Sequence, residues 1–332
     1  MAQPEGSAMG YFGLGKQGAW DSGVAPSNFS YYRNVGPDYK GTVEPIREGG
    51  GNHDNLWSWL KSLEFDGSFE VYARTDFSGF VYALCLGKDE ISGASDPYTH
   101  TITPEGQGVP TSMEFTYGAA ATAVDIVRLY DGLITGVTLA GDISNPPTLK
   151  CDYQMSKIDL TQSAASPSYE TPMRPPVWWD GVWTIDGSPV TGKVTKFSID
   201  LKYKTFDDIR TDTPTRDSLT LTDRDVSYSF TMYCYNKDFF RKVLTGTTSG
   251  TTVSNWPITG SFKIKLTQEA GPPERSLEVD LPLINYTQVK MSDLDDDNKP
   301  LIIDVSGVAM KGVGADVITV KAINATTPQY LA

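Results

Sequence analysis

The sequence predicts a mainly β protein of two tandem β-sandwich or barrel-like domains, each flanked by one short α-helix, with an extended N-terminal arm. Three observations support this prediction. Apolar and polar residues alternate along many segments, 31 Gly and 21 Pro provide many turns, and one block of strand and helix patterns occurs twice. Such alternation is typical of antiparallel sheets that pack one face and leave the other exposed.

The alternation is clearest in KFSIDLKYK, residues 196–204. Its apolar residues share one face of the expected strand: Phe197, Ile199, Leu201 and Tyr203. Its polar residues share the other face: Lys196, Ser198, Asp200, Lys202 and Lys204. Residues 112–118 and 261–269 follow the same pattern, so we expect strands of the same kind there.

Helical spacing is found in two short segments. In residues 76–87, DFSGFVYALCLG, Asp76 is a candidate N-cap and Gly87 a stop signal. In residues 236–246, NKDFFRKVLTG, Asn236 and Gly246 have the same roles. Residues 54–63, DNLWSWLKSL, fit either a helix or the start of a hairpin.

The two helical segments belong to an internal repeat. The matching blocks follow in the same order: 67–87 with 226–246, 112–117 with 261–266, 127–139 with 279–291, and 148–158 with 300–310. Three apolar residues of the first copy, Val127, Val137 and Leu149, precede three of the second by the same number of positions. Their counterparts are Val279, Val289 and Leu301. We therefore predict a tandem duplication of one β-rich domain.

A segment rich in proline and small residues, SAASPSYETPMRPPV, separates the two copies and has the composition of a linker. The predicted organisation is an N-terminal arm (1–29), a first β domain (30–162), a linker (163–176), a second β domain (177–324) and a C-terminal tail (325–332).

The stretch GLGKQG, residues 13–18, has the G-x-G-x-x-G spacing of a dinucleotide site. That fingerprint requires a preceding buried strand and a following helix. The polar MAQPEGSAMG before it and the turn-rich GAWDSGVAPSNFS after it predict neither element. We expect a loosely ordered arm here and no bound cofactor.

Charge and composition restrict the possible functions. The formal net charge is −13, which argues against ordinary nucleic-acid binding but suits a surface along which DNA must slide. The three cysteines, Cys85, Cys151 and Cys234, lie within apolar patterns. Because their number is odd, we expect reduced thiols in the core and not a set of disulfides. We expect no secretory signal and no membrane span.

No constellation for catalysis or metal binding is found, so we expect no catalytic, cofactor or metal residues and no enzyme. The two histidines, His53 and His100, have no second ligand at metal spacing and are expected in a loop or at a strand edge. The acidic loop 292–300 alternates Asp293, Asp295 and Asp297, with Asp304 at the twelfth position. Without the glycine and glutamate of a calcium loop, it is expected to be a solvated hairpin loop.

The tryptophans of PPVWWDGVW, residues 175–183, have two interpretations. Exposed Trp178 and Trp179 would form a platform that stacks on sugars, whereas buried Trp178 and Trp183 would attach the segment to a core.

The duplicated pattern resembles the tail tube proteins of long-tailed, siphovirus-like bacteriophages in their two-domain form. The resemblance covers almost the whole chain, from GYFGLGKQGAWDSGVAPSNFSYYRNVG through GSFEVYARTDFSGFVYALCLG to LPLINYTQVKMSDLDDDNKPLIIDVSGVAM. It implies three chains in a pseudo-sixfold ring, and rings that stack into a hollow tube through which double-stranded DNA passes. The lysine-rich face of Lys196, Lys202, Lys204, Lys263 and Lys265 departs from this expectation. We expect it on the outside, at interfaces, or paired with acids.

The resemblance also implies the partners: other copies of the chain, a tape-measure protein, and tail terminator and distal tail proteins. The expected location is the virion tail, after synthesis in the host cytoplasm. Two alternatives are a distal tail or baseplate hub protein with the same domain, and a carbohydrate-binding β-sandwich.

Overall fold

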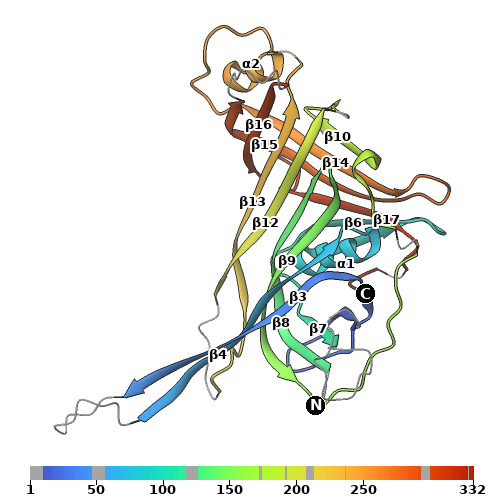
Figure 1. The fold of residues 1–332 in the computed structure, drawn as a ribbon, viewed down its shortest axis with the longest axis vertical. Coiled ribbons are helices and arrows are strands. Elements are labelled where there is room, and N and C mark those ends of the chain that lie inside the picture. Colours follow the sequence, from blue (N-terminus) through green and yellow to red (C-terminus); the bar gives the residue numbers. More distant parts are fainter. Residues whose placement is uncertain are drawn as a thin grey trace, which may run out of the picture.

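The computed structural model describes residues 10–46, 57–116, 126–171, 174–190, 193–206, 213–235, 237–292, 300–327 and 329–332. Strands dominate these residues, which also contain two α-helices, so the predicted mainly β class is confirmed. The strands form one hydrogen-bonded antiparallel network that runs through both halves of the chain (Figure 1).

The first half of the chain contains helix α1 and strands β1 to β9. Their bounds are β1 (Phe12–Lys16), β2 (Asn28–Ser30), β3 (Tyr32–Ile46), β4 (Trp57–Tyr72), α1 (Thr75–Leu86), β5 (Gly87–Ser92), β6 (Tyr98–Pro104), β7 (Thr111–Thr116), β8 (Ile126–Asp142) and β9 (Asn145–Asp159).

The second half contains helix α2, strands β10 to β17 and a 3-10 turn. Their bounds are η2 (Trp178–Asp180), β10 (Gly181–Ile185), β11 (Ser188–Pro189), β12 (Val194–Phe206), β13 (Thr220–Tyr233), α2 (Asp238–Thr245), β14 (Thr259–Glu269), β15 (Arg275–Met291), β16 (Ile302–Ala309) and β17 (Thr319–Asn324).

The period-two pattern produces one-sided strands as predicted. In β12, Phe197, Ile199 and Leu201 are at most 1% exposed, whereas Lys196, Lys202 and Lys204 on the other face are exposed. The ambiguous segment 54–63 is extended from residue 57 onward, where residues 57–71 of β4 pair with β3. The helical alternative for these described residues is therefore wrong.

Both predicted helices exist, but their N-termini differ from the prediction. The N-cap of α1 is Arg74, which makes no side-chain capping bond, and Asp76 lies in the first turn. The N-cap of α2 is Lys237, and Asn236 lies outside the described residues. The stops are as predicted, since Gly87 and Gly246 adopt left-handed conformations with φ of 94° and 83°.

The glycine stretch of the expected arm forms a buried strand instead. Phe12 and Leu14 of β1 are 0% exposed and pair with Phe115 and Met113 of β7. On the opposite face, a Cβ at Gly13 would lie only 2.7 Å from that of Pro26, so the glycine permits close backbone approach. The prediction that GLGKQG lies in a loosely ordered arm is wrong, because its apolar neighbours belong to the core.

The order of strand pairing occurs twice. In the first strand set, β1, β7, β8, β9, β4 and β3 pair in that order. In the second strand set, β10, β14, β15, β16, β13 and β12 pair in the same order. The helix follows β4 in the first set and β13 in the second. Each set therefore has the same connectivity.

The register between the last strands of the repeat differs from the prediction. Val137 of β8 pairs with Cys151, whereas its counterpart Val289 of β15 pairs with Val305. Cys151 therefore corresponds to Val305, although the register that matches Leu149 with Leu301 would place it at Ile303. A shift of this kind keeps every side chain on the same face, so the sequence pattern alone does not reveal it.

Candidate assembly interface

The two strand sets are joined edge to edge along β8 and β12. Residues 126–132 of β8 pair with β7, but residues 136–142 pair with residues 196–202 of β12. Directly across this pairing, Thr138 Oγ1 donates a 2.7 Å hydrogen bond to Asp200 Oδ1. The sheet therefore continues from the first set into the second.

The apolar side chains at this junction are as fully buried as those of a protein core. Val137 and Leu139 of β8 and Ile199 and Leu201 of β12 are each at most 1% exposed. Burial of such side chains contributes about 1.5–3 kcal/mol each. The junction thus fixes one strand set against the other.

A second contact is made by residues 213–221, which lead into β13 and lie over the first set. Arg216 donates hydrogen bonds of 2.6 and 2.9 Å to the two carboxylate oxygens of Asp66 on β4. The Leu63 N–H donates to the Pro214 carbonyl at 2.8 Å. Leu219 and Leu221 pack in one cluster with Leu133 of β8. The second set therefore covers part of the first.

Helix α1 is enclosed between the two sets (Figure 1). Residues 320–324 of β17 pair with residues 98–102 of β6 beside the helix. Ala322 and Tyr330 approach Gly79 so closely that a Cβ there would lie 2.8 Å and 2.7 Å from their nearest atoms. All residues of α1 except Asp76 are consequently buried.

A buried polar network holds the C-terminal segment in this position. The His100 Nδ1 lies 3.1 Å from Asp89, its Nε2 lies 3.0 Å from the Thr326 carbonyl, and its ring stacks on Tyr330. Burial and the nearby Asp76 raise the pKa of Tyr330 well above its usual value. His100 thus has a structural role between β5 and β17, not the strand-edge position predicted for it. His53 lies outside the described residues.

Eight strands form a continuous sheet across both sets, in the order β3, β4, β9, β8, β12, β13, β16 and β15. Within the described ranges, no strand pairs with the outer edge of β3 or with residues 287–291 of β15 on the side away from β16. Unpaired edges of this length are normally protected or used for association. These two edges are the candidate assembly surfaces.

The strand β3 and its partner β4 also carry exposed apolar side chains. Together they extend away from the body of the molecule (Figure 1). The exposed residues, 40–66% accessible, are Tyr39, Val43, Trp57, Trp59 and Leu60. A gathering of this kind on a monomer indicates an interaction surface.

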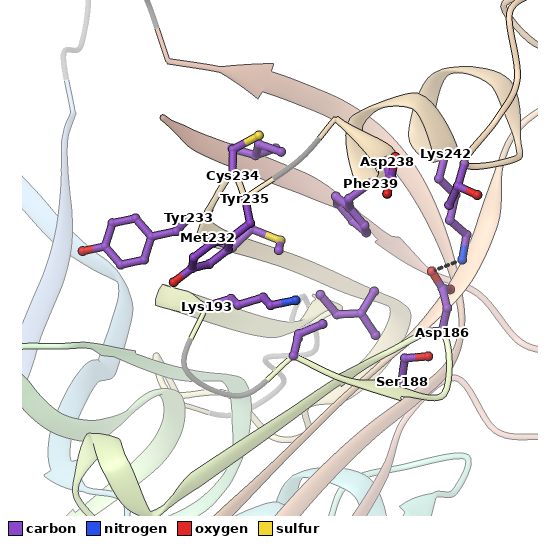
Figure 2. A pocket seen from close by; sticks show the side chains of 14 residues that line it. Asp186, Ser188, Lys193, Met232, Tyr233, Cys234, Tyr235, Asp238, Phe239 and Lys242 are labelled. Carbon is purple, nitrogen blue, oxygen red and sulfur yellow. Dashed lines mark hydrogen bonds and ion pairs between the residues drawn. The ribbon is translucent and has the colours of Figure 1, made fainter. Parts of the chain in front are cut away.

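Helix α2 lies over a cavity of about 240 Å³ at the end of the second set (Figure 2). Lys242 of the helix forms a 2.6 Å ion pair with Asp186, which also accepts a hydrogen bond from Tyr286. Phe239 and Met232 line the cavity with other apolar residues. No residue of α2 is buried, although all its residues are described, in contrast to the enclosed α1.

The tryptophan cluster belongs to the core. Trp178 and Trp183 are 8% and 1% exposed, and their rings lie 4.7 Å apart. Trp179 alone is exposed, at 79%. This geometry supports the core interpretation over a sugar-stacking platform, which requires several accessible rings.

The remaining candidate residues have structural environments. Cys85 and Cys151 are buried thiols, and burial raises the pKa of Cys85 to about 12. The central part of the acidic loop, 293–299, lies outside the described residues, and Asp304 accepts a hydrogen bond from Thr231 within the sheet. In the part of the chain that the structure describes, no group of three His, Cys, Asp or Glu is arranged to hold a metal ion.

Three of the five lysines on the polar face form ion pairs with acidic side chains, which was one of the three environments expected for them. Lys263 contacts Glu278 and Asp280, at 3.2 and 3.1 Å. The other two pairs are Lys265 with Glu274 and Lys204 with Asp223. Their positive charge is therefore locally balanced.

No helix among the described residues is long and apolar enough to cross a membrane. A search of curated proteins finds no match. The model of the family described as "Phage tail tube protein" matches residues 60–306, which is well over half of the chain and includes strands of both sets. The chain therefore belongs to the phage tail tube protein family.

Proposed function

We propose that this protein is the subunit of a long-tailed phage tail tube and that it contains two copies of one tube domain. Three chains would associate side by side into a pseudo-sixfold ring. Rings would then stack into a hollow tube through which the double-stranded DNA genome reaches the host. The single observation that carries this proposal is the eight-stranded sheet, which crosses both strand sets and, within the described residues, is unpaired along the outer edge of β3 at one end and along residues 287–291 of β15 at the other.

Matched irregularities support the duplication. The break in register between Ile134 and Gly136 of β8 has its counterpart between Tyr286 and Gln288 of β15. The break between Tyr32 and Asn34 of β3 has its counterpart between residues 194 and 196 of β12. Bulges at the same places in two strand sets are features of a common design.

The junction between β8 and β12 suggests how chains would associate. It joins two different surfaces, one from each set, so it is a heterologous contact. Repetition of such a contact between chains would close a ring if the rotation per domain is a sixth of a turn. Three chains would then supply six domains, with every domain in nearly the same environment.

The two helices support the same arrangement. The second set covers α1, whereas α2 has a comparable place after β13 and no covering element among the described residues. Side-by-side association would place the first set of a neighbouring chain beside α2. The cavity below α2 would then lie at the chain-to-chain contact.

The polar face of the eight-stranded sheet is the candidate lumen surface. The chain has a net charge of −13, and on this sheet Lys204 of β12 is paired with Asp223 of β13. A lumen with little free positive charge would not hold the phosphates of passing DNA. This supports transit of DNA without binding.

The family membership also supports the wider expectations. We propose that the protein assembles in the host cytoplasm with a tape-measure protein, is completed by terminator and distal tail proteins, and resides in the virion tail. Its role in this proposal is structural and involves no catalysis.

Electron microscopy of the purified protein across a concentration series, with light scattering for particle mass, tests the proposal. We expect hollow tubes of stacked rings with three chains in each ring. Closed rings that never stack would instead indicate a hub at the end of a tail. A monomer at every concentration, also after addition of preformed tube ends, would contradict a tube subunit.

A further inference from the structure

The two end strands of the eight-stranded sheet correspond to the two strands that pair at the internal junction. In the second strand set, β15 is the counterpart of β8; in the first, β3 is the counterpart of β12. Within the chain, β8 and β12 pair with each other. The described residues provide no such partner for β15 or β3.

We propose that residues 288–292, at the end of β15, pair antiparallel with residues 36–40 of β3 in a second copy of this chain. The proposed register places Lys290 opposite Asp38 and Val289 opposite Tyr39. This inference rests on the proposed function, because it specifies the contact between neighbours in the ring.

The register follows from the matched bulges. Ile134 of β8 and Tyr286 of β15 occupy the same bulge position, so Thr138 and Lys290, which lie equally far beyond them, correspond to each other. The bulges at the start of β3 and β12 match in the same way, which makes Asp38 the counterpart of Asp200. Since Thr138 lies opposite Asp200, Lys290 should lie opposite Asp38.

The chemistry at this central pair is complementary. In the internal junction, Thr138 donates a hydrogen bond to Asp200. At the proposed contact, an ammonium group would face the carboxylate of Asp38. Both Asp38 and Lys290 are exposed, and neither is ion-paired with another described residue. An opposite-charge pair directly across two strands favours pairing.

Differences in burial point to the same residues. Leu201 is 0% exposed because β8 and the first strand set cover it, whereas its counterpart Tyr39 is 66% exposed. On the other strand, Val137 is 1% exposed, whereas its counterpart Val289 is only half-buried. The positions that are buried at the internal junction are thus the ones that remain accessible at the two ends of the eight-stranded sheet.

The extension of β3 and β4 has a similar counterpart. Leu221 of β13 is 3% exposed and packs on the first strand set of its own chain. Leu221 pairs with Thr205 of β12, and the matching position of β3, Val43, pairs with Leu60 of β4. Leu60 is therefore the counterpart of Leu221, and it is 40% exposed. A neighbouring second strand set would cover this apolar surface, including Trp57 and Trp59, in the same way.

Cysteine cross-linking in the assembled protein tests the register. We would introduce Asp38→Cys with Lys290→Cys in a Cys234→Ser background and oxidise the full-length chain under assembly conditions. Directly opposed strand residues have the close Cβ separation that a disulfide requires. We expect covalent two-chain and three-chain species on a denaturing gel. The matched control pairs Asp38→Cys with Gln288→Cys, which is two residues out of register and should cross-link at least about fivefold less.

Charge reversal provides an independent measurement. Asp38→Lys or Lys290→Asp alone should raise the concentration needed for assembly about tenfold, which corresponds to about 1.4 kcal/mol. The double reversal should restore it to within about threefold of the original. Lys311→Asp, an exposed substitution outside the contact, should leave assembly unchanged.

The outcomes separate this inference from the proposed function. Tubes that form while neither cysteine pair cross-links would overturn the β3–β15 contact and leave the tube function standing. Efficient cross-linking of the out-of-register pair alone would overturn the register. Absence of both assembly and cross-linking in the unsubstituted and substituted chains would overturn both proposals.

Discussion

Arg216, from the second half of the chain, forms a two-pronged ion pair with Asp66 of the first half, with distances of 2.6 and 2.9 Å. The Arg216 side chain is only 1% exposed, and it also donates to the Met155 carbonyl. Arg216→Ala would leave Asp66 and this carbonyl without their shared donor. We expect it to lower the free energy of unfolding by about 2–4 kcal/mol, measured by chemical denaturation of the unassembled chain.

A surface pair provides the control for Arg216. Lys204 and Asp223 form an ion pair with side chains 68% and 71% exposed. Lys204→Ala should therefore change the free energy of unfolding by less than about 1 kcal/mol. Equal effects of the two substitutions would show that Arg216 does not hold the two strand sets together.

The close approach of strands at Gly307 predicts a second effect. A Cβ on Gly307 would lie 1.9 Å from the Asn285 carbonyl oxygen and 2.6 Å from the Tyr228 hydroxyl. Because backbone must move to accommodate it, Gly307→Ala should destabilise the protein by about 1–3 kcal/mol. Gly106→Ala, where a Cβ meets no atom within 4 Å, is the matched control and should be nearly neutral. Thermal unfolding of both variants checks this expectation.

Substitutions in the tryptophan cluster distinguish a role in the core from sugar binding. Trp183 is 1% exposed and packs against Trp178, so Trp183→Ala should cost about 3–5 kcal/mol of unfolding free energy. Trp179→Ala removes a ring that is 79% exposed and should change stability by less than about 0.5 kcal/mol. Loss of binding on a glycan array by the folded Trp179→Ala variant would instead favour the carbohydrate-binding alternative.

The sequence predicts the strands well because each strand has one buried and one exposed face. The faces of residues 196–204 are those of β12, and the glycine stops of both helices are as expected. Caps are less predictable, since Arg74 and Lys237 precede the helices without a capping side chain. Contacts distant in sequence, such as that of Thr75 with Gln268, replace the local signal.

The candidate assembly interface was not predictable from alternation. Residues on β12 and β3 have similar patterns, yet one strand is covered by β8 and the other has a free edge. Strand partners depend on the whole topology, and a register shift of two residues preserves the pattern. The strand Phe12–Lys16 was missed for a related reason: its glycines suggest a loop, while its partner β7 is distant in the sequence.

The linker carboxylate Glu170 should make stability depend on pH. Burial, and then the charge of Asp76, raise the pKa of Glu170 to about 7 in the folded protein, from 4.5 as its ordinary value. The folded state therefore holds a proton that the unfolded state has lost between these values. Stability from this group is complete below about pH 4.5 and falls as pH rises through 7, by roughly 2–3 kcal/mol.

Glu170→Gln isolates this contribution, because the amide keeps the shape of the protonated acid and has no charge to bury. The variant should match the original protein near pH 5 and be more stable by roughly 2 kcal/mol at pH 8. Denaturation curves at both pH values measure the difference, with Glu269→Gln as an exposed control. A variant less stable than the original at pH 8 would mean that the ionised carboxylate is a favourable partner for the first turn of α1, where Glu170 accepts from the Phe77 N–H.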